Sequence, residues 1–102
     1  MRRCNLEVQP RAEQDIVRID TWWRENRPGA PDLFYDEFER ATEFLRSAPR
    51  IGRLDRATGL PGVRRYLIRA TGHHIYYCFR DELDTVVILA LWNAVSGHGP
   101  LL

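Results

Sequence analysis

The side chains best suited to chemistry are arginines gathered in one part of the chain. Residues 49–80 carry seven arginines and one acidic residue, Asp55, so their net charge is 7 − 1 = +6. All fifteen basic residues of the protein are arginines, whose planar guanidinium groups make paired contacts to carboxylates or phosphates. This charge predicts contact with an acidic protein segment or with a nucleic acid. The four arginines that follow the turn at residues 61–62 are Arg64, Arg65, Arg69 and Arg80.

Catalysis by these arginines would need acid–base groups that the sequence supplies poorly. Cleavage of RNA through its 2′-hydroxyl requires a base, an acid and cations that stabilise the phosphorane. Residues 93–96 follow the last apolar run and offer no general acid or base. His98 is the one late candidate, and a histidine between glycines is more typical of an exposed position. If the protein cleaves RNA, the predicted catalytic set is Arg64, Arg65, Arg69, Arg80 and His98, but the sequence favours a protein that is not an enzyme.

Metal and cofactor chemistry is not indicated either. The spacings C-x-x-C and H-x₃₋₅-H do not occur, and there is no glycine-rich phosphate motif or nucleophile elbow. Cys4 and Cys78 are too few for a disulfide framework, and we interpret both as free thiols in a reducing cytoplasm. We therefore expect no cofactor and no metal site among Cys4, Cys78, His73, His74 and His98.

Two amphipathic helices precede the basic region. Apolar residues recur at helical spacing from Ala12 to Trp23, and the stretch at 26–29 ends this first helix. A second helix is predicted from about residue 31 to residue 48, and Pro49 stops it. Because only a few residues link them, the two helices should pack as an antiparallel hairpin.

Four strands complete the predicted architecture. A short strand at 3–8 precedes the helices, residues 49–61 form a basic loop, and strands follow at 62–70, 73–80 and 85–93. The order β-α-α-β-β-β predicts a two-layer α+β fold, with the helix hairpin packed on a mainly antiparallel four-stranded sheet. With 102 residues, we expect one domain spanning 1–102. No apolar run approaches the ~18 residues that span a membrane, and the N-terminus lacks a signal-peptide core, so we expect a cytoplasmic protein.

The last strand predicts a covered second face of the sheet. Residues 85–93 contain no charge and are apolar on both faces: simple alternation places Ile88 with Trp92 and Leu89 with Leu91. Two helices cover only one face, and exposed apolar area of this kind usually marks an interface. We expect an external partner or a second copy to cover the other face, with the C-terminal tail as the alternative.

Strand geometry separates the arginines. Neighbouring residues of a strand point to opposite faces, so Arg64 and Arg65 cannot bind one ligand together unless the strand is bulged. Arg65 and Arg69 share a face. We expect one of this last pair to form an ion pair with the acidic helices and the other to be free for a partner.

Order and motifs together resemble the RelE/ParE toxins of type II toxin–antitoxin modules. The resemblance covers residues 5–98. Its residues are Ala12, Asp15, Ile16 and Ile19 in the first helix, Leu45, Pro49 and Gly52 leaving the second, "LPGVRR" at 60–65, "HIYY" at 74–77 and "ILALW" at 88–92. It implies a sheet with the first strand beside the last. It also implies a ParD-like or RelB-like antitoxin that wraps the toxin in a hetero-oligomer. From the apolar last strand and the arginines we expect the antitoxin or the target to bind near Arg64, Arg65, Arg69, Tyr76, Leu91 and Trp92.

The resemblance implies two alternative targets. RelE-like members cleave messenger RNA on the ribosome and resemble one another in cations on the middle strands and a late tyrosine or histidine. This chain has no tyrosine after Tyr77. We therefore favour a ParE-like toxin that acts on DNA gyrase and blocks replication, with the RelE-like ribonuclease as the alternative. A non-toxic basic nucleic-acid-binding module is an alternative of another class.

Overall fold

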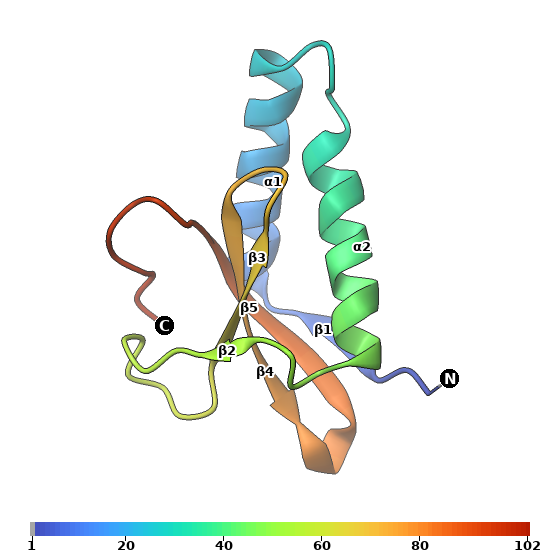
Figure 1. Cartoon of the computed structure of the whole chain (residues 1–102), viewed down its shortest axis with the longest axis vertical. Coiled ribbons are helices and arrows are strands. Elements are labelled where there is room, and N and C mark those ends of the chain that lie inside the picture. Colours follow the sequence, from blue (N-terminus) through green and yellow to red (C-terminus); the bar gives the residue numbers. More distant parts are fainter. Residues whose placement is uncertain (1) are drawn as a thin grey trace.

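The structure, a computed structural model, describes residues 2–102 as a helix hairpin on a twisted five-stranded sheet (Figure 1). The strands lie in the order β1-β5-β4-β3-β2, with β1 parallel to β5 and the other pairs antiparallel. This confirms the two-layer α+β fold and the first strand beside the last. In chain order the elements are β1 Asn5–Val8, α1 Pro10–Asn26, α2 Leu33–Ser47, β2 Arg53–Leu54, β3 Arg64–Ile68, β4 His73–Arg80, the single 3₁₀ turn η1 Asp81–Leu83 and β5 Thr85–Asn93.

The sheet has one strand more than predicted. β2 is only two residues long and lies within the segment 49–61 that we predicted as a loop. It pairs Arg53 with Arg65 and Leu54 with Arg64 at the free edge of β3. No helix within residues 2–102 is long and apolar enough to cross a membrane.

The main core lies between the helices and one face of the sheet. It buries side chains from both helices and from three strands, with Phe34, Leu45, Ile75, Ile88 and Leu91 fully enclosed. The helical apolar stripes therefore pack where their periodicity predicted.

A β-bulge in β5 changes which residues share a face. Tyr76 pairs with Ala90 while Tyr77 pairs with Ile88, so Leu89 is an extra residue in the ladder. As a result Leu91 joins Ile88 in the helix-side core. The simple alternation that placed Ile88 with Trp92 was wrong, because one extra residue inverts every side chain beyond it.

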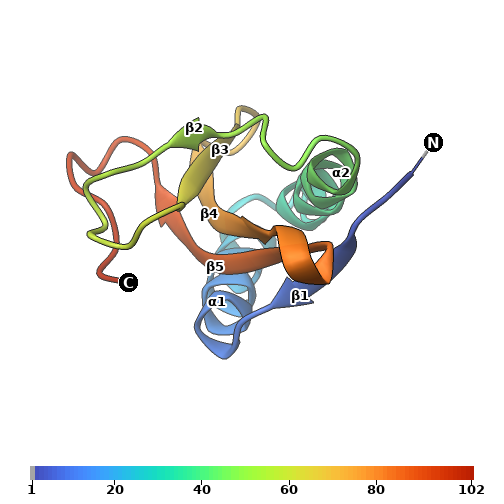
Figure 2. The same cartoon turned by 90° about the horizontal axis from the view of Figure 1, so that it is seen from below.

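The C-terminal tail, residues 94–102, covers part of the second face. Leu102 packs with Trp92 against a small buried cluster of Val63, Tyr76 and Ala90. Figure 2 shows the tail in red beside the loop that joins β2 to β3, away from α2. The tail therefore covers part of the sheet face that we had expected an external partner or a second copy to cover.

Candidate functional site

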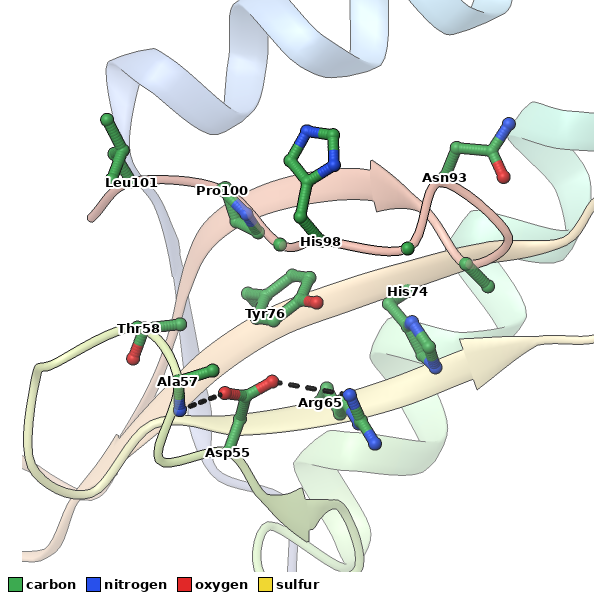
Figure 3. A pocket seen from close by; sticks show the side chains of 13 residues that line it. Asp55, Ala57, Thr58, Arg65, His74, Tyr76, Asn93, His98, Pro100 and Leu101 are labelled. Carbon is green, nitrogen blue, oxygen red and sulfur yellow. Dashed lines mark hydrogen bonds and ion pairs between the residues drawn. The ribbon is translucent and has the colours of Figure 1, made fainter.

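A hollow of about 380 Å³ lies under the tail on the face of the sheet opposite the helices (Figure 3). β3 contributes Arg65, β4 contributes His74 and Tyr76, and the segment after β2 contributes Asp55. The tail closes the hollow with residues 97–101. Side chains from four separate segments therefore converge on one space, which we call the tail hollow.

Asp55 and Arg65 form the charged centre of the tail hollow. Arg65 Nη1 lies 3.5 Å from Asp55 Oδ2, and the amide of Ala57 donates to Asp55 Oδ1 at 2.8 Å. The Asp55 residue is only 8% exposed, so its charge depends on these partners. We expected Arg65 or Arg69 to pair with acidic helix residues. Instead Arg65 pairs with the loop acid, because its side chain points away from the helices.

His74 and Tyr76 are the groups of the tail hollow that could exchange protons. Burial lowers the pKa of His74, nearby Arg65 lowers it further, and Asp55 opposes the shift. Burial raises the pKa of Tyr76, Asp55 adds to this, and Arg65 opposes it. The two rings meet edge to face with centroids 6.0 Å apart. Both shifts favour the neutral forms, so His74 is available as a base while Tyr76 is a weaker acid than an exposed tyrosine.

His98 stabilises the tail instead of joining this centre. Its ring packs edge-on against Trp92 with centroids 5.6 Å apart, and its Nδ1 lies 3.1 Å from the Ser96 carbonyl oxygen. The Trp92 indole donates to Ser96 Oγ at 2.8 Å. In Figure 3 the His98 ring points away from Arg65 and His74.

The other predicted site residues lie apart from the tail hollow. Arg64 points to the opposite face, where its Nη1 donates to the Gly52 carbonyl at 2.8 Å. Arg69 follows β3 beside α2, and Arg80 ends β4. Leu91 is fully buried in the helix-side core, so it offers no exposed surface to a partner.

The sequence interpretation missed Asp55 as a site residue and considered His74 only as a possible metal ligand. One signal for Asp55 was present, because it is the single acidic residue between 49 and 80. A lone carboxylate in a strongly basic segment is a natural partner for one of its arginines. His74 gave no such signal, since its burial depends on a tail that has no periodicity.

The tail hollow is electrically balanced. Arg65 is the only arginine among its lining residues and Asp55 the only acid, so the two charges cancel. A phosphate entering the hollow would find no unpaired guanidinium among these residues. Within residues 2–102, no three or more His, Cys, Asp or Glu side chains are grouped to hold a metal.

A comparison with known protein families gives a match over nearly the whole chain. Residues 6–95 match the family described as the ParE toxin of type II toxin–antitoxin system, parDE. No curated protein sequence matches.

Solved structures with a similar fold are RelE toxins. A mutant of E. coli RelE in the free state shares 18% identity at a TM-score of 0.62, covering 93% of this chain and 87% of that one. RelE in the intact E. coli RelBE toxin–antitoxin complex shares 19% at 0.56, with 89% and 96% covered. The toxin–antitoxin complex RelBE2 from Mycobacterium tuberculosis shares 24% at 0.59, with 91% and 93% covered.

Proposed function

Because this chain belongs to the RelE/ParE family of toxins of type II toxin–antitoxin systems, we propose that it is a ParE-like toxin acting on DNA gyrase in the cytoplasm. It would inhibit gyrase by binding, and no bond would be cleaved by the toxin itself. The family match over residues 6–95 is to the ParE branch by name, which supports this choice.

The observation that carries the proposal is the neutralised arginine of the tail hollow. A cationic group contributes to phosphoryl transfer only when it can face the charge that develops in the transition state. Arg65 is paired with buried Asp55, while Arg64 points to the other face, where it binds the Gly52 carbonyl. This arrangement supports a toxin whose surface binds its target without cleaving a nucleic acid.

An antitoxin partner follows from the same family membership. The neighbours of similar fold include two toxin–antitoxin complexes, which supports a ParD-like or RelB-like antitoxin that neutralises this chain in a hetero-oligomer.

Two measurements test the proposed target. The purified chain should inhibit supercoiling of relaxed plasmid by gyrase, and this inhibition should be relieved by the antitoxin encoded in the adjacent reading frame. In induced cells, transcript ends should show no codon-phased cuts. Phased cuts in ribosome-bound messages together with normal supercoiling would contradict the proposal.

A RelE-like ribonuclease is the second candidate, favoured by His74 beside Arg65 in the same hollow. In that case His74 would be the base, and Arg65 would have to leave Asp55 to contact the scissile phosphate. His74→Gln and Arg65→Gln would then abolish both growth inhibition and phased cuts. A gyrase inhibitor carrying His74→Gln should still slow growth, so this single variant separates the two candidates.

A further inference from the structure

A second hollow of about 380 Å³ lies at the C-terminal end of α1 and shares one lining residue, Asn93, with the tail hollow. Its walls include both adjacent tryptophans, Trp22 and Trp23, together with Arg18 and Arg27. The turn between β3 and β4 contributes Thr71 and His73, and Ile19 and Asn93 complete the lining. We call it the tryptophan hollow.

Arg27 is held over the tryptophans but keeps its charge unpaired. Its Cζ atom lies 5.3 Å from the centre of the Trp22 ring and 5.8 Å from that of Trp23. Stacking of this kind orients the guanidinium. Arg27 Nη1 donates to the Asn26 carbonyl at 3.4 Å, and the remaining N–H groups are available. Across residues 2–102, no carboxylate lies within ion-pair distance of Arg27.

Trp22 is the apolar part of the tryptophan hollow that remains in contact with water. It is 47% exposed, whereas Ile19 below it is 7% exposed. The two indole rings meet nearly at right angles with centroids 5.9 Å apart, which fixes the Trp22 ring against Trp23. Tryptophan and arginine are among the residue types most enriched where the binding energy of an interface concentrates.

The lining of the tryptophan hollow defines the chemistry of its occupant. It contains two arginines and no acid, and His73 is held neutral because burial and Arg18 lower its pKa. Arg18 already pairs with Asp15, so Arg27 offers the free positive charge. The occupant must therefore bring a negative charge next to an apolar group.

We propose that the tryptophan hollow docks a segment of the antitoxin that places an apolar side chain against Trp22 and a single carboxylate on Arg27. This deepens the proposed function and rests on it. The volume, about 380 Å³, suits one large side chain with its neighbouring backbone.

The surroundings of the tryptophan hollow favour a peptide over a nucleic acid. Residues 9–48, which include both helices, carry six arginines and nine acids, a net charge of 6 − 9 = −3. A nucleic acid carries a charge at every phosphate and would be repelled by the adjacent acidic surface. A short peptide needs to place its carboxylate at Arg27 alone.

The test measures binding of the wild-type chain and its variants to the purified antitoxin from the adjacent reading frame, by calorimetry. Trp22→Ser and Arg27→Gln should each weaken binding by roughly 10- to 30-fold, as loss of a central anchor does. Val17→Ser is the matched apolar control, since Val17 is 65% exposed on the same helix. Arg40→Gln is the charge control, because the Arg40 side chain is 76% exposed on α2. Both controls should bind as the wild type does.

The outcomes separate the inference from the function on which it rests. Wild-type binding that Trp22→Ser and Arg27→Gln leave unchanged overturns the inference alone. No binding by the folded wild-type chain overturns the antitoxin partnership and the inference together. A short single-stranded oligonucleotide that quenches the tryptophan fluorescence of the wild type but not of Trp22→Ser, and that competes with the antitoxin, would also overturn it, by assigning the tryptophan hollow to a nucleic acid. Circular dichroism of each variant verifies that loss of binding is not loss of the fold.

Discussion

Asp15 shows how one polar residue joins a helix to an irregular strand. β1 pairs with β5 only as far as Ile88, so the Leu91 amide lies beyond the end of β1 and donates instead to Asp15 Oδ2 at 3.0 Å. Arg11 and Arg18, one turn on either side of Asp15, also donate to its carboxylate at 3.2 and 3.0 Å. A buried carboxylate is stable here because each of its oxygens has a donor.

Replacing Asp15 tests this connection. Asp15→Ala leaves the Leu91 N–H buried and unpaired, so we expect the free energy of unfolding to fall by about 1–3 kcal/mol. Asp15→Asn keeps an acceptor oxygen and should lose less. Glu37→Ala is the control, because its pair with largely exposed Arg40 is worth only about 0.2–1 kcal/mol. Urea denaturation gives all four values, and a loss in Asp15→Ala no larger than in the control would contradict the connection.

His73 links stability to pH. Burial lowers its pKa, and Arg18 lowers it further. In the unfolded chain the pKa of a histidine is about 6.5. As the pH falls through this value, the unfolded state takes up protons that folded His73 resists, so the free energy of unfolding falls. Above that pH both states are neutral at this residue, and the difference vanishes.

The corresponding variant is His73→Gln. Urea denaturation at about pH 7.5 and about pH 5.5 should show a loss of stability in the wild type that His73→Gln reduces. His74, whose pKa is lowered in the same direction, should account for part of the remaining loss, so the double variant should be flatter still. A wild-type pH dependence that persists unchanged in His73→Gln would exclude this role.

At the scale of elements, periodic segments could be predicted and irregular ones could not. Both helices and the strands β3, β4 and β5 carry repeating patterns that a window of residues reveals. The bulge at Leu89 could not be seen, because one extra residue leaves the composition of β5 unchanged. β2 is too short for any pattern, and the tail has none. The tail hollow depends on β2 and the tail, and for that reason its Asp55–Arg65 centre escaped sequence analysis.

Removing the C-terminal tail should change both the stability and the self-association of the chain. A chain ending at residue 94 loses Leu102 and uncovers Tyr76, which is only 3% exposed beneath it. Uncovering one large side chain should lower the free energy of unfolding by about 1.5–3 kcal/mol. The bared face should also bind a second copy, so light scattering should detect self-association. Leu101→Ser is the control, because Leu101 is 92% exposed and should leave both properties unchanged. A monomeric truncated chain with wild-type stability would show that the tail is not a structural cover.

The charge distribution of the whole molecule differs from what the basic segment alone suggested. Arg65 and Arg50 are paired with Asp55 and Asp81, and Arg64 is bound to a backbone carbonyl. The remaining arginines of residues 49–80 are spread over the β2 edge, the following loop and the far ends of β3 and β4. The net charge of +6 on this segment is therefore not arranged as a continuous cationic track on the surface.

Binding of the free chain to random DNA tests this distribution at the molecular scale. Each neutralised phosphate contributes about −0.9 to the slope of log affinity against log salt concentration. Four arginines acting together would give a slope of about −3 to −4. Scattered arginines reach only one or two phosphates at once and should give a shallower slope of about −1 to −2. We expect weak binding near physiological salt, measured by fluorescence anisotropy with a short random duplex at about 50 mM and about 200 mM salt. Arg53→Gln, which removes a cation at the open sheet edge, should change this weak affinity only slightly. Submicromolar binding with a steep slope would instead support the nucleic-acid-binding module, because it would require several arginines to contact one duplex together.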